Sequence, residues 1–427
     1  MSEWSSFDTI TKGKGIWLID SKGNKIIDAV GSMWCNVWGH SNPQLVKAIT
    51  NQSKKIQHSS LFNFTNEPVE KLAENLIKIS PGMNKVFYSD NGSSAMEIAI
   101  KMALQYWKNI GQSNKTQIAT VENGYHGDTF GAMSVGYVPE FFGKFKKQLF
   151  STIQFPVPNK YRVPKGFTYA DYQNDCLEKI EKRFSKNNDI AAFIMESGAQ
   201  MAGGVIIYPK GFQNKISKLC NKYNILFVLD EIATGFGRLG SMVQYQEQKS
   251  VPDIVAYGKM LTGGYLTMAA TLSNKKIYDS FSGEFKDWKH LFHGHTYTGN
   301  PIAAAVANEN IHMYKKYNLI KKIQKTSKIF SKYFQEILDI DIVGDVRHKG
   351  MLMGIELVSN KDKKTPIKTK KSINKVFFEE GKKQGIYLRT LGNIVMLVPP
   401  LSIQENELEL LLKRTIKTIQ ASKSKII

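Results

Sequence analysis

Two ionisable side chains, Asp230 and Lys259, each end an apolar run and together suggest one chemistry. Asp230 ends residues 224–230, and Lys259 ends residues 253–259. Because buried strands of an open α/β sheet present ligand-facing residues at their carboxyl ends, both side chains are expected at one sheet edge. There a lysine can form a Schiff base with pyridoxal phosphate, while an aspartate keeps the pyridine nitrogen protonated. The pair predicts a pyridoxal-phosphate site; the alternative for Lys259 is an ordinary surface lysine.

Other carboxylates follow the same pattern. Asp90 and Glu196 come at the ends of two further apolar runs, so with Asp230 they place three carboxylates at one edge. A single one could be a capping group, whereas three beside a lysine favour a site. Ile232 could pack behind the cofactor ring, and Lys259 could move a proton between the substrate carbon and the cofactor.

A glycine-containing turn offers a place for the phosphate. Gly92 and Ser93 precede a helix expected over residues 94–107, where free backbone amides bind anions. An ordinary strand–helix turn is the alternative. The segment from Ser94 to Glu97 fits a capping box for this helix.

Two other segments carry polar groups suited to the same ligand. Tyr125 stands between two glycines and could stack on a flat ring, with His126 close to it; a core tyrosine is the alternative. His293 and His295 could suggest a metal, but no third ligand has matching spacing, so no metal site is expected. Thr296 and the backbone amides beside it are better suited to a phosphate.

The length and composition are those of a folded protein with two or three domains, or with one large domain and a smaller partner. The chain has 427 residues, 42% of them hydrophobic, and its net charge of +21 comes mainly from scattered lysines. The densest lysine stretch, residues 360–375, lacks interleaved aromatics, so no nucleic-acid partner is expected. The three cysteines lack metal-ligand spacing and are expected to be reduced thiols. No signal peptide or membrane-length apolar run is present, so a cytoplasmic protein without a membrane partner is expected.

The pattern of apolar runs predicts an α/β fold. Runs bounded by turn signals cover residues 85–90, 116–121, 191–197, 225–231, 253–259 and 266–273. Helical periodicity between them predicts a large domain whose mainly parallel sheet is sandwiched by helices. A hairpin turn at residues 20–24, and helices and short strands after residue 305, predict a smaller α+β domain. We assign residues 1–45 and 305–427 to the small domain and residues 46–304 to the large one.

At this point the chain resembles a known family. Residues 230–238 (DEIATGFGR) followed by residues 258–264 (GKMLTGG) resemble the lysine signature of class III (omega) aminotransferases. Within that class, residues 102–107 and 123–129 resemble the 8-amino-7-oxononanoate aminotransferases of biotin synthesis. The resemblance runs from about Gly15 to Pro400. It implies a pyridoxal-phosphate enzyme of fold type I and an obligate homodimer with small-molecule substrates.

The resemblance also implies roles for individual residues. It assigns Lys259 to the Schiff base, places His295 and Thr296 at the neighbouring subunit's phosphate pocket, and matches Arg389 to the clamp on the substrate carboxylate. The predicted catalytic residues are Lys259, Asp230 and Tyr125. The predicted cofactor-binding residues are Gly92, Ser93, Tyr125, Asp230, Ile232, Lys259, His295 and Thr296. The predicted substrate-binding residues are Trp34, Tyr125, Lys259, Gly294 and Arg389.

Departures from the family pattern bear on the amino donor. Met33-Trp34 replaces the paired tryptophans common in members that use S-adenosylmethionine, and Gly294-His295-Thr296 replaces their Gly-Pro-Thr. Both differences resemble the subgroup that uses lysine. We therefore expect conversion of 8-amino-7-oxononanoate to 7,8-diaminononanoate with L-lysine as donor. The alternatives are S-adenosylmethionine as donor, or another omega-aminotransferase acting on 4-aminobutyrate, ornithine or a diamine. The family's N-terminal segment is longer and includes an aromatic residue that lines the pocket, so here that wall is expected to be missing or to be supplied by another residue, such as Trp4 or Phe7.

Overall fold

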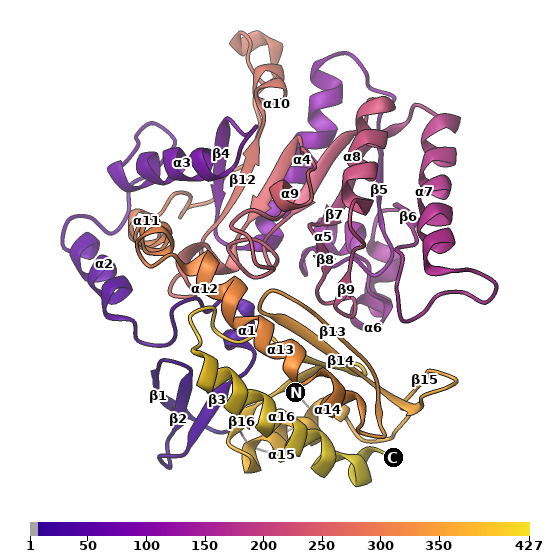
Figure 1. Cartoon of the computed structure of the whole chain (residues 1–427). Coiled ribbons are helices and arrows are strands. Elements are labelled where there is room, and N and C mark those ends of the chain that lie inside the picture. Colours follow the sequence, from indigo (N-terminus) through magenta and orange to yellow (C-terminus); the bar gives the residue numbers. More distant parts are fainter. Residues whose placement is uncertain (1–6) are drawn as a thin grey trace.

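The computed structural model describes residues 7–427, and its centre is a seven-stranded sheet (Figure 1). The strand order is β4-β12-β11-β10-β7-β5-β6. The bounds are β4 (Lys85–Ser89), β5 (Gln117–Val121), β6 (Ile153–Phe155), β7 (Ile190–Glu196), β10 (Leu226–Asp230), β11 (Ile254–Tyr257) and β12 (Ala269–Ser273). β12 runs antiparallel to β11 and β4, whereas the other neighbouring pairs are parallel. The predicted α/β class is confirmed; each predicted run contains a strand, and β6 was not predicted.

Alternation along the strands divides the core between the two faces of this sheet. Phe193 and Phe227 belong to one apolar cluster with residues of α3 (Glu67–Ile79), α7 (Tyr169–Lys186) and α8 (Phe212–Lys222). Ile194 and Val228, their neighbours in sequence, belong to another cluster with α4 (Gly92–Asn109). Helices therefore cover both faces, and the carboxyl edge is left to the loops that form the site.

Two smaller sheets contain the chain ends. The first has the order β1-β2-β3-β16, and the second contains β13, β14, β17 and β18 with β15 beside β14. Their bounds are β1 (Ile10–Lys14), β2 (Trp17–Asp20), β3 (Lys25–Asp28), β13 (Val343–Lys349), β14 (Leu352–Asn360), β15 (Thr365–Pro366), β16 (Ile386–Tyr387), β17 (Arg389–Leu391) and β18 (Ile394–Leu397). The predicted hairpin is the antiparallel pair β2–β3, and β16 adds to β3 in parallel. The exact division of the chain at residues 45 and 305 stays a prediction.

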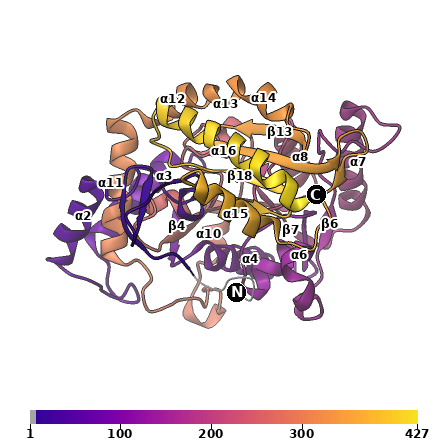
Figure 2. The same ribbon diagram turned by 90° about the horizontal axis from the view of Figure 1, so that it is seen from below.

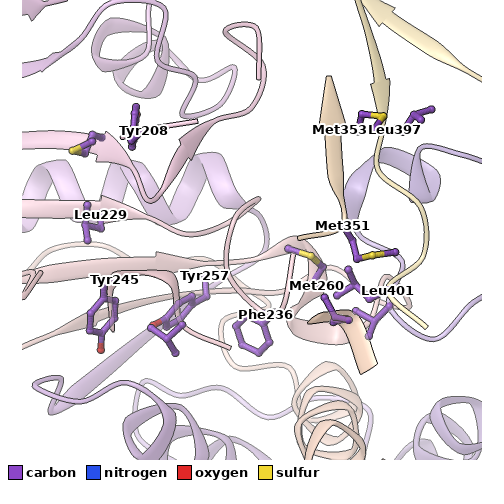
Figure 3. Close-up of a cluster of buried hydrophobic side chains, with 14 of the residues drawn as sticks. Tyr208, Leu229, Phe236, Tyr245, Tyr257, Met260, Met351, Met353, Leu397 and Leu401 are labelled. Atoms are coloured by element: carbon purple, nitrogen blue, oxygen red, sulfur yellow. The ribbon is translucent and has the colours of Figure 1, made fainter. Parts of the chain in front are cut away.

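Helices and buried side chains join these sheets to the centre. Figure 2 shows α15 (Ile373–Lys383) and α16 (Glu405–Ile426) lying against each other beside the strands of the chain ends. One apolar cluster runs from Leu229 and Tyr257 in the central sheet, through Met260, to Met353 and Leu397 in the β14–β18 sheet (Figure 3). The small sheets are thus fixed against the central one by a shared core.

The remaining elements are further helices, short turns and one short strand pair. They are α1 (Gly31–Trp34), α2 (Pro43–Ser53), α5 (Phe130–Val135), α6 (Pro139–Phe142), η1 (Gly143–Gln148), β8 (Ala199–Gln200), β9 (Ile206–Ile207), α9 (Gln244–Glu247), η2 (Lys259–Thr262), α10 (Lys275–Ser280), η3 (Phe285–Asp287), α11 (Pro301–Lys316), α12 (Leu319–Thr326), α13 (Lys328–Lys332) and α14 (Phe334–Leu338). Within residues 7–427, no helix is long and apolar enough to cross a membrane. The same residues contain no group of three or more His, Cys, Asp or Glu side chains placed to hold a metal ion.

Candidate active site

A cavity of about 430 Å³ opens at the carboxyl edge of the central sheet, and most of the predicted site residues line it. The predicted residues in its wall are Trp34, Gly92, Ser93, Tyr125, Asp230, Ile232 and Lys259. Its volume lies within the range of about 300–1,000 Å³ typical of small-molecule sites. Residues that are far apart in the sequence therefore meet in one place, as the strand ends predicted.

Lys259 lies two residues beyond the end of β11 rather than within it. It begins the short 3-10 turn η2 and has a φ of 40°, in the left-handed region. Its ammonium nitrogen is 5.5 Å from the centre of the Trp34 ring. Burial lowers the pKa of the Lys259 ammonium group, and the carboxylates of Asp230 and Glu196 oppose that change. A lysine with a lowered pKa is more readily available as a neutral amine.

Asp230 is held by two hydrogen bonds at the end of β10. Its Oδ2 lies 2.8 Å from His126 Nδ1, and its Oδ1 accepts a bond of 2.9 Å from the backbone N–H of Ile232. His126 Nε2 is buried and has no hydrogen-bond partner among the described residues. His126 therefore orients the carboxylate while keeping one ring nitrogen for another group.

Glu196 occupies the cavity wall beside these residues. It accepts hydrogen bonds from the backbone N–H groups of Met201 (2.8 Å) and Tyr125 (3.2 Å). Burial raises the pKa of the Glu196 carboxyl to about 7, against the opposing charge of His126. Near neutral pH this side chain is therefore only partly ionised. The buried backbone contact also fixes Tyr125 at the edge of the cavity.

Tyr125 is half-buried and oriented by its neighbours. Its hydroxyl donates a 2.9 Å hydrogen bond to Asp128 Oδ1, and its ring stacks with Phe142 at 6.1 Å. Burial raises the pKa of the Tyr125 hydroxyl, with the Asp128 hydrogen bond adding to the effect. The ring is thus a neutral flat surface in the cavity wall.

The amino terminus of α4 lies in the wall of the cavity. Asn91 caps this 18-residue helix by accepting a hydrogen bond from Ser94 N, while Gly92 and Ser93 form its first turn. A Cβ atom on Gly92 would lie 2.9 Å from two carbons of Ile232, so only glycine fits this contact. Free amides at a helix start favour a phosphate group.

The predicted capping box of α4 is wrong. Asn91, not Ser94, occupies the cap, and the helix begins at Gly92. Glu97 instead accepts hydrogen bonds from Thr129 Oγ1, Gly131 N and Ala132 N, which start the helix α5. The Glu97 carboxylate thus binds a distant segment, although the local sequence pattern had assigned it to the start of its own helix.

Four predicted site residues do not line the cavity: Gly294, His295, Thr296 and Arg389. His295 Nδ1 lies 3.3 Å from Asp90 Oδ1 at the cavity wall. Arg389 contacts the sulfur of Met33, which does line the cavity, and also borders a separate apolar cavity of about 390 Å³ with Phe7. Trp4 lies outside the described residues.

The prediction missed part of the cavity wall. Cys35, Thr234 and residues 264–268 complete the wall, and Met33 appeared in the prediction only as a departure from the family pattern. The loop of residues 264–268 follows Lys259 and leads into β12. The loop joins the lysine that follows β11 to the start of β12, so it must lie at the carboxyl edge of the sheet. That position was the signal that could have identified it.

Comparisons with known proteins identify the family of this chain. The family model "Aminotransferase class-III" matches residues 2–419. The adenosylmethionine-8-amino-7-oxononanoate aminotransferase of Aquifex aeolicus is 41% identical, over 96% of this chain and 91% of the relative. The protein of the same name from Staphylococcus aureus is 44% identical, over 95% and 90%.

Solved structures show the same similarity. The adenosylmethionine-8-amino-7-oxononanoate aminotransferase of Methanocaldococcus jannaschii has a TM-score of 0.89 and 40% identity, covering 97% of this chain and 93% of that one. An omega transaminase of Pseudomonas jessenii in complex with PMP has a TM-score of 0.93 and 29% identity, covering 98% and 94%.

Proposed function

Because this chain belongs to the class III aminotransferase family and is an aminotransferase, we propose that its acceptor is 8-amino-7-oxononanoate. Amination of the 7-keto group would give 7,8-diaminononanoate, a step of biotin synthesis. The names of the relatives support S-adenosylmethionine as the amino donor. They do not support the expected lysine donor, so the alternative donor becomes the proposal. The observation that carries this proposal is the similarity to those relatives over almost the whole chain.

We propose pyridoxal phosphate as the cofactor, because the cavity offers a matching group for each part of it. The first turn of α4 suits the phosphate, Asp230 suits the pyridine nitrogen, and Lys259 suits the aldehyde. Two buried donors in the wall, His126 Nε2 and Trp34 Nε1, have no protein partner within residues 7–427. When bound, pyridoxal phosphate supplies an electron sink that stabilises negative charge on the substrate carbon.

The chain's own residues would then hold and move protons. Asp230, fixed by His126, would keep a proton on the facing nitrogen, because a buried carboxylate favours the nearby positive charge. Lys259 would take a proton from the donor carbon and return one to the acceptor carbon. Its lowered pKa makes the neutral amine easier to reach, which favours this exchange. Glu196, only partly ionised, would add little charge to compete with Asp230.

Substrate recognition would involve the outer part of the cavity. Trp34 and Tyr125 would flank the apolar chain of the acceptor, and Arg389 would bind its carboxylate as a bidentate clamp. The contact between Arg389 and Met33 places this guanidinium next to a cavity-lining side chain. The carboxylate role of Arg389 rests on that position and on its match to the family.

We also propose a homodimer. Several large aromatic side chains are exposed in the single chain, among them Phe62 (76%), Phe64 (74%) and Phe285 (78%). Exposed apolar groups of this size commonly mark protein interfaces. In a dimer, His295 and Thr296 would be available to the second subunit's phosphate site. Sedimentation at micromolar protein concentration should give twice the chain mass.

The donor can be tested in the first half of the reaction. Protein loaded with pyridoxal phosphate is mixed separately with S-adenosylmethionine, lysine and 4-aminobutyrate, and the cofactor absorbance is followed. S-adenosylmethionine alone should convert the cofactor to its amine form, and subsequent addition of 8-amino-7-oxononanoate should reverse the change.

The other outcomes decide against parts of the proposal. Conversion by lysine alone would overturn the proposed donor and restore the original expectation. Conversion only by 4-aminobutyrate, with no reversal by the keto acid, would overturn the proposed acceptor as well.

A further inference from the structure

The part of the cavity wall that lies nearest the β1–β2–β3–β16 sheet is a turn with a strained backbone. Gly31, Ser32, Met33 and Trp34 have φ angles of 53°, 53°, 92° and 72°. L-residues rarely adopt this left-handed region, and three of them in succession after a glycine persist only where the surroundings fix them. The turn is labelled α1 in Figure 1, where it lies between the β1–β2–β3–β16 sheet and the central part of the molecule.

The side chain of Asp28 holds this turn. Asp28 ends β3 and is completely buried. Its Oδ1 accepts hydrogen bonds from the N–H groups of Val30 (3.3 Å) and Ser32 (3.1 Å), and its Oδ2 accepts one of 2.8 Å from Ser32 Oγ. His40 Nε2 lies 3.0 Å from the same Oδ2. One carboxylate therefore fixes the start of the turn through three donors and a histidine.

Packing behind the turn leaves it little freedom. A Cβ atom on Gly31 would lie 2.7 Å from the carbonyl oxygen of Val398, so no other residue fits there. His40 is itself fixed by a pair of backbone hydrogen bonds with Gly15. A Cβ atom on Gly13 would come within 2.7 Å of the His40 side chain. The support of Asp28 therefore extends into the β1–β2 hairpin.

The turn carries two side chains to the site. Trp34 is buried in the cavity wall, with Lys259 Nζ 5.5 Å from its ring centre. Met33 is 47% exposed, lines the same cavity and contacts the guanidinium of Arg389. One short turn thus touches both the lysine and the arginine of the candidate site.

We propose that Asp28, supported by His40, is a positioning residue that sets the place of Met33 and Trp34 and thereby the affinity for the keto-acid acceptor. Asp28 does not itself line the cavity, and it acts through the backbone of the turn. The statement about the acceptor rests on the proposed function; the statement about the turn does not. Loss of the carboxylate should let the backbone leave the left-handed region and move both side chains.

A matched control exists in the same sheet. Asp20 ends β2, is 4% exposed and accepts hydrogen bonds from Lys22 N (2.9 Å), Asn24 N (2.8 Å) and Asn24 Nδ2 (2.8 Å). It caps a turn in the same way as Asp28 but lines no part of the candidate site. A general loss of stability should therefore appear in both variants, and a change at the site only in Asp28→Ala.

The first measurement is independent of the reaction. Acrylamide quenching of Trp34 fluorescence is obtained as the difference between each protein and its Trp34→Phe partner, since the chain has six tryptophans. Quenching should rise at least about threefold in Asp28→Ala and stay unchanged in Asp20→Ala. Unchanged quenching in Asp28→Ala, or an equal rise in both variants, would overturn the positioning role, whatever the substrate is.

The second measurement separates substrate binding from catalysis. In Asp28→Ala we expect KM for 8-amino-7-oxononanoate to rise about tenfold or more while kcat changes less than about threefold. Affinity for pyridoxal phosphate, titrated by fluorescence, should stay within about threefold, because Gly92, Ser93 and Asp230 are untouched. Asp28→Asn keeps one acceptor oxygen, so its KM for the keto acid should lie between those of Asp28→Ala and the parent protein.

A milder variant covers the case in which Asp28→Ala does not fold. Ser32→Ala removes only the 2.8 Å bond to Asp28 Oδ2. It should raise both Trp34 quenching and KM about twofold to fivefold. If the parent protein does not turn over the keto acid, the proposed function is refuted. The quenching result would still decide the role of Asp28. A rise in quenching without a rise in KM would overturn the link to acceptor affinity.

Discussion

The two edges of the central sheet each hold a lysine withdrawn from solvent, and the two lysines have opposite surroundings. Lys115, just before β5, is 2% exposed; its Nζ donates hydrogen bonds to the carbonyls of Asn224 (2.6 Å) and Ile190 (3.2 Å) and lies 4.4 Å from the Trp107 ring. Lys259, at the carboxyl edge, faces a cavity with Asp230 in its wall.

Burial lowers the pKa of both ammonium groups, in Lys115 to about 8. A lowered lysine pKa alone therefore does not identify a catalytic residue. The difference lies in the partners: carbonyl groups and an indole ring satisfy Lys115 in place, whereas Lys259 faces space for a ligand. Lys115 joins strand ends, whereas Lys259 faces the cavity.

The largest loss of activity is expected when the amine of Lys259, at the carboxyl edge of the sheet, is removed. Lys259→Ala should lower turnover at least about 10³-fold, because no other amine lines the cavity within the described residues. The melting temperature of the cofactor-free protein should stay within about 4 °C. Steady-state kinetics and thermal unfolding measure the two effects, and substantial residual turnover would refute the assignment.

A smaller effect is expected from the cation outside the cavity. Arg389→Ala should raise KM for the keto acid about 10- to 100-fold, since a charge-assisted bidentate pair is lost. The value of kcat should fall much less than in Lys259→Ala. An acceptor analogue without the carboxylate should be equally poor with both proteins; if it distinguishes them, the clamp role is wrong.

Replacing Lys115 should leave activity nearly unchanged in the same assays. Lys115→Met should leave kcat and KM within about threefold, because the residue lies at the edge opposite the cavity. A larger loss of activity would show that the two sheet edges are coupled and would break the comparison.

The smallest effect is a dependence of stability on pH. The pKa of Lys115 is about 8 in the folded protein and about 10.4 in an unfolded chain. Between these values the unfolded state binds more protons, so the folded state gains stability as pH rises from 8 towards 10.4, by at most about 3 kcal/mol. The melting temperature of the parent should therefore rise relative to that of Lys115→Met over that range. A difference that stays constant would show that the carbonyl contacts prevent the shift.

The central sheet was predictable because its strands are continuous apolar runs, and their carboxyl ends identified Asp230 and Lys259. Contacts between distant segments were not predictable from the sequence. Glu97 fits a local capping pattern, yet its oxygen binds donors at the start of α5. The left-handed turn at Ser32–Trp34 has no glycine after Gly31, and its supports, the buried Asp28 carboxylate and the packing of Gly31 against Val398, come from tertiary structure. The His295 and Met33 patterns favoured a lysine donor that the relatives do not support.

The pairing of β16 with β3 has a consequence for how the protein is made. Ile27 leaves the ribosome early, but its partner Ile386 is nearly the last part of the chain to be synthesised. At about 5–20 residues per second, the N-terminal hairpin waits roughly 20–70 s for that strand. The backbone bonds that tie Ala29, next to the turn, to Tyr387 and Val398 can form only then. A nascent chain truncated before residue 386 should therefore lack this support for the cavity wall.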